Sequence, residues 1–229
     1  MKIACVYFLL FFFYSFCGWL LEVSCKLISD HKFINRGFLV GPYCPIYGTG
    51  AILMSILLEK YLNDSFTLFI MTILLCSILE YFTSYALEKI FKTRWWDYST
   101  KRFHINGRIC LETMVPFGLL GLFLMYVSNP FLLSIINEFS NVWLYFFTFI
   151  LFFIMLFDCC FSIKIMSSLQ SISSNIRSDS TERITLLVRK EIMKRNERLQ
   201  RRLVDAFPRL QVLYSKGLEK RLKKEKKRK

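Results

Sequence analysis

The sequence lacks the short motifs that identify several common enzyme classes. It has no G-x-x-x-x-G-K-[ST] phosphate loop, so this chain does not hydrolyse ATP by that route. It also has no G-x-S-x-G or H-E-x-x-H segment, which removes two widespread hydrolase mechanisms. Histidine occurs only twice, and no group of Cys and His has metal-ligand spacing. We expect no metal and no cofactor, and the sequence favours a non-enzymatic role without deciding the matter.

Cysteine is present eight times, but without the spacing of a structural framework. No two cysteines form a C-x-x-C pair, and most lie within or beside apolar segments. A free Cys in such a position behaves as a small buried hydrophobic residue. The cysteines therefore predict neither a disulfide framework nor a zinc site.

Apolar and basic residues, in contrast, are abundant. Hydrophobic residues make up 54% of the chain, 24 residues are Phe, and the mean hydropathy is +0.39. This excess has to be buried in lipid, so the composition predicts a membrane protein. The formal net charge of +14 would suit nucleic acid, but 20 of the 31 Lys and Arg lie from Lys164 onward. Such clustering beside apolar segments favours the anionic inner leaflet of a lipid bilayer as the partner, and no nucleic acid.

Five segments are long and apolar enough to cross a bilayer, which takes about 20 residues. They lie at residues 3–25, 40–58, 66–88, 109–128 and 141–163. The predicted fold class is all-α, a polytopic membrane protein of about five transmembrane helices. Glycine and proline crowd the start of the second segment, which predicts a broken or re-entrant turn buried in protein.

The distribution of Lys and Arg between alternating loops predicts the orientation. The loops at 26–41 and 89–108, together with the chain from Lys164 onward, hold 29 of the 31 basic residues. Basic loops stay in the cytoplasm, so we expect the N-terminus outside and the C-terminus inside the cell. Residues 1–165 then form the transmembrane domain, and residues 166–229 form a cytoplasmic basic tail.

The tail begins with a Ser-rich linker and continues in a helical pattern. From Glu182 onward apolar residues recur at spacings of three, four and seven between Lys and Arg, which predicts an amphipathic basic helix. The final stretch, Lys216–Lys229, holds nine basic residues. The amphipathic helix can lie on the anionic inner leaflet or pair with another helix, and we expect the final basic run to bind the leaflet electrostatically.

Ionisable residues in or beside the predicted spans are the most informative, because a charge in lipid is costly unless it is paired or hydrated. One interpretation is a cytoplasm-facing polar cavity in which arginine forks hold an anionic or zwitterionic ligand. The other is that the same acids and arginines neutralise one another and lock the helices together. The sequence leaves both open. The candidate polar site comprises Glu22, Asn35, Arg36, Glu80, Glu88, Arg94, Asp97, Asn106, Arg108 and Glu112.

Other polar and aromatic residues have simpler predicted roles. Trp95 and Trp96 are expected as interfacial anchors at the lipid headgroups. Asp97 is expected to cap a short interfacial helix. Asp158, within the last span, is expected to pair with Lys164 at its end.

The two basic loops share a weak internal repeat. Asn35 aligns with Asn106 and Pro45 with Pro116, each asparagine has an arginine nearby, and each loop follows a helix that carries a glutamate. Parallel repeats of this kind build transport folds around a site at the repeat interface.

Several long blocks resemble one known family. The blocks are CGWLLE (17–22), INRGFLVGPYCPIYGTG (34–50), LEYFTSYALEKIFKTRWWDYS (79–99) and NGRICLETMVPFG (106–118). They are similar to the ABC-transporter type IV membrane proteins, the CmpB-like permeases of bacteria. The resemblance covers residues 5–128 and extends to the fifth span in general character.

The resemblance implies a bacterial cell-membrane protein whose ATPase would be a separate chain, or one that assembles as a homo-oligomer. It brings with it no substrate and no catalytic residue. His104 stands where the family more often has Asn, which argues against a role for it in proton transfer.

Three functions are compatible with the sequence. The first is a permease or transport component with a cytoplasm-facing polar site and an unknown substrate. The second is an intramembrane enzyme acting on a lipid or isoprenoid headgroup, with Glu80 or Glu112 as general base and Arg94 or Arg108 binding phosphate. The third is a structural or regulatory membrane protein.

Overall fold

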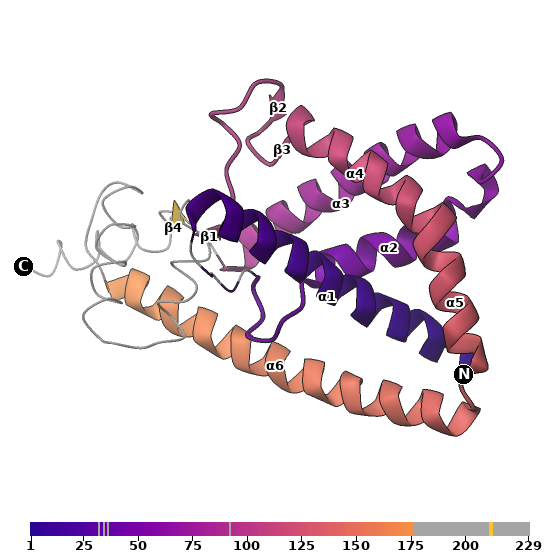
Figure 1. Cartoon of the computed structure of the whole chain (residues 1–229). Coiled ribbons are helices and arrows are strands. Elements are labelled where there is room, and N and C mark those ends of the chain that lie inside the picture. The colour runs from indigo at the N-terminus through magenta and orange to yellow at the C-terminus, as the bar shows by residue number, and fades with distance from the viewer. Residues whose placement is uncertain (32, 34, 36, 92, 176–210, 213–229) are drawn as a thin grey trace, which may run out of the picture.

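The computed structural model describes residues 1–31, 33, 35, 37–91, 93–175 and 211–212, and helices account for most of them (Figure 1). The helices are α1 (Lys2–Asp30), α2 (Pro45–Leu57), α3 (Ser65–Phe91), α4 (Leu111–Phe123), α5 (Asn129–Glu138) and α6 (Asn141–Asn175), with a 3-10 turn η1 (Glu59–Tyr61) and a π-helical turn η2 (Leu124–Ser128). The short strands β1 (Thr93–Arg94) and β4 (Gln211–Val212) pair antiparallel, as do β2 (His104–Ile105) and β3 (Ile109–Cys110). The amphipathic helix and the basic run predicted for the tail lie outside these residues.

Four helical stretches are long and apolar enough to cross a membrane. They are Lys2–Ile28, Ser65–Phe91, Leu111–Glu138 and Asn141–Ser167. The predictions of a helical fold and of a membrane protein are confirmed at this level. The segment predicted at 40–58 contains instead the 13-residue helix α2, which is about 20 Å long at 1.5 Å per residue and so shorter than a bilayer core.

The segment before α2 runs inside the bundle. The backbone N–H of Cys44 donates a 2.8 Å hydrogen bond to the carbonyl of Ser15, which lies midway along α1. Pro45 then starts α2, a position where its missing N–H costs no helical hydrogen bond. Residues 40–44 are non-helical, in line with the broken turn expected from the crowded glycines and prolines.

The helical stretch that begins with α4 continues further than the sequence suggests. We predicted that it would end at residue 128, but α4, η2 and α5 form one continuous stretch to Glu138. Pro130 lacks an N–H to donate, and the π-helical turn lies directly before it. Asn129 is buried there, with its side-chain nitrogen 2.6 Å from Ser55 Oγ and its oxygen accepting a 2.8 Å hydrogen bond from Tyr14.

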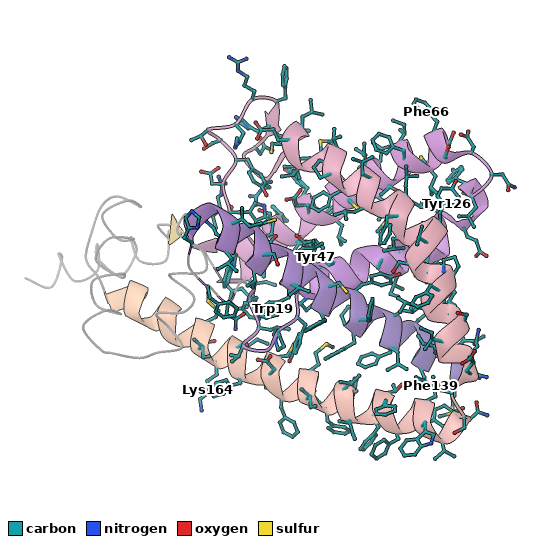
Figure 2. The ribbon with its side chains drawn as sticks, viewed as in Figure 1. Trp19, Tyr47, Phe66, Tyr126, Phe139 and Lys164 are labelled. Atoms are coloured by element: carbon teal, nitrogen blue, oxygen red, sulfur yellow. The ribbon has the colours of Figure 1, made fainter. Side chains whose placement is uncertain are left out.

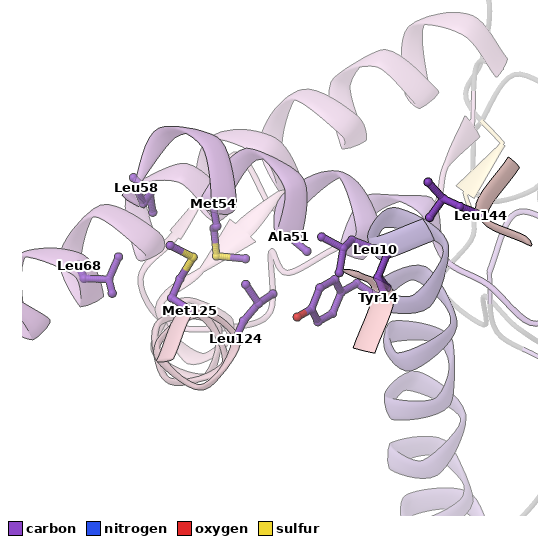
Figure 3. Close-up of a cluster of buried hydrophobic side chains, with 10 residues drawn as sticks. Leu10, Tyr14, Ala51, Met54, Leu58, Leu68, Leu124, Met125 and Leu144 are labelled. Atoms are coloured by element: carbon purple, nitrogen blue, oxygen red, sulfur yellow. The ribbon is translucent and has the colours of Figure 1, made fainter. Parts of the chain in front are cut away.

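The apolar core lies between α1, α2, the start of α3 and η2 (Figure 3). Leu10, Ala51, Met54, Leu68 and Leu124 are among its buried residues. Helix α6 runs along the outside of α1 (Figure 1). Only 6% of its most apolar stretch is buried in the protein, against 22–28% for the corresponding stretches of the other three spans. Its many phenylalanines therefore mostly face outward, as expected for a helix covered by lipid.

Candidate functional site

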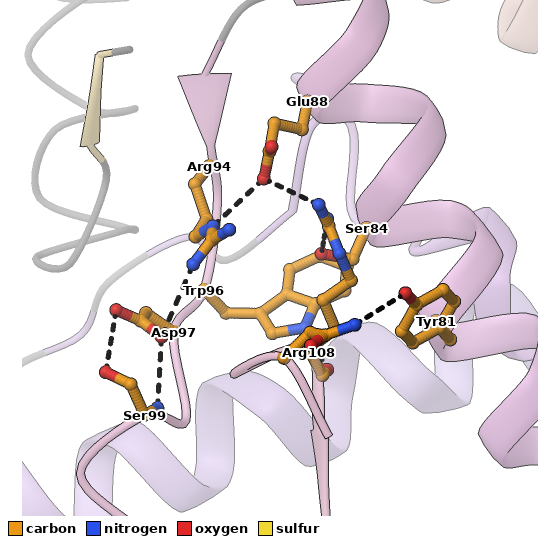
Figure 4. Close-up of polar contacts among 9 residues, drawn as sticks. Tyr81, Ser84, Glu88, Arg94, Trp96, Asp97, Ser99 and Arg108 are labelled. Atoms are coloured by element: carbon orange, nitrogen blue, oxygen red, sulfur yellow. Dashed lines mark hydrogen bonds and ion pairs between the residues drawn. The ribbon is translucent and has the colours of Figure 1, made fainter. Parts of the chain in front are cut away.

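Glu88, near the end of α3, binds two arginines of the loop that follows (Figure 4). Its Oε2 atom lies 2.9 Å from Arg94 Nε and 3.0 Å from Arg108 Nη2. The guanidinium of Arg108 is buried, donates a 3.0 Å hydrogen bond to Ser84 and lies over the rings of Tyr81 and Tyr85. Glu88 thus holds both arginines to the end of α3.

The loop from Thr93 to Cys110 has a defined structure that holds these arginines. Asp97 accepts 3.0 Å hydrogen bonds from the N–H and the hydroxyl of Ser99 and lies 3.8 Å from Arg94. No helix begins at Asp97, so the predicted helix cap is wrong, and the carboxylate closes a local turn instead. Gly107 has a φ of +67°, and a Cβ there would lie 2.4 Å from Asp97 Oδ1.

The two tryptophans of this loop face the protein. Trp95 is 2% exposed and packs edge-on against Phe38 at 5.5 Å between ring centroids. Trp96 donates a 3.0 Å hydrogen bond to the carbonyl of Arg108. The prediction that both anchor the headgroup region is therefore wrong for Trp95, which is covered by the chain itself. Phe103 and Ile105 are the exposed large apolar residues among those described in the loop, at 79% and 55%.

Glu112 does not join the arginine cluster. Glu112 forms an exposed 2.6 Å ion pair with Lys101. Arg36 lies outside the described residues. The expected meeting of Arg94 and Arg108 with Glu80 and Glu112 is thus replaced by their shared pairing with Glu88.

The two loop asparagines of the proposed repeat have related roles. The Trp19 indole N–H donates a 2.6 Å hydrogen bond to Asn35, and Asn106 donates a 3.0 Å hydrogen bond to the Tyr81 hydroxyl. Each loop is thus fixed to an aromatic residue of the preceding helix. The aligned prolines differ, because Pro45 starts α2 whereas Pro116 lies inside α4.

Asp158 does not pair with Lys164. Its carboxylate accepts hydrogen bonds from the N–H groups of Val40 at 3.0 Å and Gly41 at 2.7 Å, and from the Tyr43 hydroxyl at 2.6 Å. The side chain of Lys164 points away from the bundle (Figure 2). Two backbone N–H groups and a phenol of the segment before α2 thus satisfy this carboxylate, and charge-assisted hydrogen bonds of this kind are strong.

A second polar cluster lies deeper, between the helices. The Tyr47 hydroxyl on α2 donates a 2.7 Å hydrogen bond to Glu22 on α1, and the Tyr98 hydroxyl donates a 3.2 Å hydrogen bond to Glu80 on α3. The two carboxyl groups lie near enough for the charge of Glu22 to act on Glu80. We call Glu22, Tyr47, Glu80 and Tyr98 the Glu–Tyr cluster. Tyr47 lies within the bundle (Figure 2).

Glu80 is the least satisfied member of the cluster. It is 7% exposed, and no group in the described part of the chain donates a hydrogen bond to its Oε2 atom. Burial, followed by the charge of Glu80 and the hydrogen bond to it, raises the pKa of the Tyr98 phenol above its usual value of 10.0. Tyr98 therefore remains a protonated donor at neutral pH.

Helix α3 presents a polar face to its neighbours. Ser77, Glu80 and Ser84 are buried, and their spacing of three and four residues places them on one side of the helix. Thr72 is also buried, and a Cβ added at Gly121 of α4 would lie 2.2 Å from its methyl group. The small residue on α4 thus lets the polar face of α3 pack closely.

Tyr47 and Tyr98 were absent from the candidate residues. A tyrosine in a membrane protein is unremarkable by composition, and only its distance to a carboxylate shows its role. Tyr98 does lie in the RWWDYS block that carries the family resemblance, which was the available signal.

The four long apolar helices define a polytopic membrane protein, and the carboxyl group of Glu80 is buried within it. The model of the family described as "Putative ABC-transporter type IV" matches residues 9–163, and the chain belongs to that family. Comparisons with curated proteins and with solved structures give no match. In the described ranges, no group of three His, Cys, Asp or Glu is placed to hold a metal ion.

Proposed function

We propose that this chain is the membrane-embedded component of a transporter, a permease subunit whose intramembrane binding site is the Glu–Tyr cluster. The observation that carries the proposal is the buried carboxyl of Glu80, which has one oxygen without a hydrogen-bond donor among the described residues. A purely structural polar contact would be expected to satisfy both oxygens, because an unsatisfied buried acceptor costs about 1–3 kcal/mol. A binding site tolerates that cost in the absence of its ligand.

In this proposal the arginine cluster and the Glu–Tyr cluster have different roles. Both interpretations drawn from the sequence then apply, each to a different set of residues. Glu88 and Asp97 neutralise Arg94 and Arg108 and fix the loop, whereas Glu80 keeps one carboxylate oxygen without a donor among the described residues. With Arg94 and Arg108 engaged in this way, the Glu–Tyr cluster is better suited to a cationic group than to the anionic headgroup first considered.

The enzyme hypothesis loses its geometric basis. It requires a general base next to a phosphate-binding arginine. Glu112 is exposed and bound to Lys101, and Arg108 is bound to Glu88 and Ser84. Transport is therefore the function that the geometry supports best.

In this proposal the loops at 31–44 and 92–110 face the bacterial cytoplasm. The distribution of Lys and Arg supports this orientation, with the N-terminus outside and the basic tail against the anionic inner leaflet. The chain has no phosphate loop, and its family name points to an ABC transporter, so the ATPase is a separate chain.

The test is purification of the full chain from its native membranes in mild detergent. We expect a protein with a phosphate-loop motif to co-purify and to hydrolyse ATP. Cells with Glu80→Gln should accumulate or lose solutes differently from wild type in an untargeted metabolite comparison, whereas cells with the control Glu112→Gln should match wild type. A chain that purifies without an ATPase, with solute profiles identical in both variants, would refute the proposal.

A further inference from the structure

The Glu–Tyr cluster also indicates what kind of ligand it takes. We infer that Glu80, with Glu22 beside it, binds a monovalent cation, either a proton or an alkali metal ion, between α1, α2 and α3. This inference rests on the proposed function, since it names the ligand class of the same site.

The first argument is the hydrogen bonding of Glu80. Tyr98 donates to Oε1 at 3.2 Å, and Oε2 has no donor in the part of the chain that the structure describes. No Lys or Arg among those residues forms an ion pair with Glu80. An ionised carboxylate in that position is costly, and a proton or a bound cation on Oε2 removes the cost.

The second argument is the presence of another carboxyl group. Glu22 of α1 lies close to Glu80, so that carboxylate and phenol oxygens gather at one place between the helices. Phenol groups from Tyr47 and Tyr98 supply neutral oxygens on two sides, and neutral and anionic oxygens are the ligands that alkali and other hard cations prefer.

The packing around the cluster favours a small cation. A Cβ added at Gly18 would lie 2.2 Å from the ring of Tyr47, so that ring is pressed against α1. On its other side the Tyr47 ring contacts Phe117 of α4 at 6.4 Å between centroids. Among the described residues, the titratable groups near Glu80 or its tyrosines are Glu22 of α1, Cys44 before α2, Tyr47 of α2, Cys76 of α3, Tyr98 of the loop and Cys110 of β3.

Further unpaired oxygens lie along α3 from Glu80. Ser77 Oγ is about one helical turn away on the same side of the helix, whereas Thr72 Oγ1 is about two turns away on the side that packs against Gly121 of α4. Both residues are more than nine-tenths buried, and neither oxygen has a hydrogen-bond partner among the described residues. The Ser77 hydroxyl is independent evidence for a ligand, because it is an unpartnered polar group on the face of α3 that carries Glu80.

The experiment is labelling of the purified full chain with dicyclohexylcarbodiimide. The carboxyl proton passes to a nitrogen of the carbodiimide while the carboxyl oxygen bonds to its central carbon, and rearrangement leaves a stable N-acylurea. Peptide mass spectrometry locates the label. Labelling is measured as the pH rises from about 5 to about 9, in sodium, potassium, lithium and choline chloride.

We expect label on Glu80, lost in Glu80→Gln and retained in the control Glu112→Gln. A label that falls with pH and does not respond to the salts identifies the proton as the ligand. A label that sodium, potassium or lithium suppresses, but choline does not, identifies the metal ion. No label on Glu80 at any pH, or a label indifferent to both pH and salt, overturns the inference.

A second measurement guards against poor access of the reagent. The infrared C=O stretch of a protonated carboxyl, compared between wild type and Glu80→Gln, reports the same group without a label. The inference is also overturned if this C=O band is absent at every pH and no alkali cation changes the thermal stability of the protein. These results do not depend on an ATPase, so the inference can fail while co-purification still supports the proposed function.

Discussion

The hydroxyl of Tyr43 donates a 2.6 Å hydrogen bond to the carboxylate of Asp158, and joins the segment before α2 to helix α6. The same carboxylate accepts from the N–H groups of Val40 and Gly41 and from the hydroxyl of Ser162. Helix α6 is otherwise little buried. Asp158 thus satisfies backbone donors that would be exposed to an apolar environment, and it fixes a peripheral helix to the bundle.

Replacing Asp158 with Asn should loosen the segment before α2. The amide cannot accept from all four donors with the strength of a carboxylate, because charge-assisted hydrogen bonds are about twice as strong as neutral ones. We expect faster hydrogen exchange at residues 38–44, measured by mass spectrometry in detergent. Thr148→Val on the same helix is the control and should leave this exchange unchanged. Equal exchange in wild type and Asp158→Asn would show that other contacts hold the segment.

Replacing Glu88 with Gln should destabilise the loop from Thr93 to Cys110 more than replacing any other acidic residue near that loop. Glu88 binds two guanidinium groups, one of them buried, and losing hydrogen bonds to charged groups costs about 2–3 kcal/mol. We expect a lower melting temperature, followed by intrinsic fluorescence on heating. Glu112→Gln is the matched control: it breaks an exposed pair with Lys101 and should cost less than about 1 kcal/mol. Similar losses in both variants would contradict this account.

The membrane helices were largely predictable from sequence, because burial in lipid requires long apolar runs. The segments 3–25 and 66–88 lie within the observed α1 and α3. The error at Asn129 has a physical cause. Asn followed by Pro usually marks a turn, but here Tyr14 and Ser55 bind the Asn side chain inside the bundle, and the helix continues through a π-helical turn.

Candidate residues could be selected from the sequence more easily than the contacts between them could be predicted. Buried acids stand out in apolar segments, so Glu22, Glu80 and Glu88 could be selected from sequence alone. Which arginine reaches which acid depends on the path of the loop, and that path depends on tertiary hydrogen bonds such as Trp96 to the Arg108 carbonyl. Spacing along the chain contains no information about those bonds.

Gly18 should be intolerant of a methyl group. An added Cβ would lie 2.2 Å from Tyr47 Cγ, so Gly18→Ala must displace the ring that binds Glu22. Overpacking of this kind costs about 1–3 kcal/mol, and the melting temperature should fall accordingly. At Gly50 the nearest atom would be 3.4 Å away, so Gly50→Ala is the matched control and should be neutral, or stabilising by up to about 1 kcal/mol. If Gly18→Ala is as stable as Gly50→Ala, the Tyr47 ring is not held against α1.

Tyr98 should make the stability of the protein depend on alkaline pH. Its folded-state pKa is raised above 10.0 by burial and by Glu80, so the folded chain keeps the phenol protonated where the unfolded chain ionises it. The stabilisation by Tyr98 is therefore fully present below about pH 10 and is lost as the pH rises toward the folded-state value. Tyr98→Phe removes the hydrogen bond to Glu80, which is worth about 1 kcal/mol, and removes this titration.

The measurement for Tyr98 is the difference in melting temperature between wild type and Tyr98→Phe as a function of pH. We expect wild type to be the more stable from neutral pH to about pH 10 and the difference to shrink above it. Because the other tyrosines titrate equally in both proteins, their effects cancel in the difference. Tyr126→Phe is the control: its hydroxyl donates to the carbonyl of Leu62 and not to a carboxylate, so it should show no such trend. A difference that stays constant above pH 10, or that grows, would mean that Tyr98 is not held as a neutral donor to Glu80.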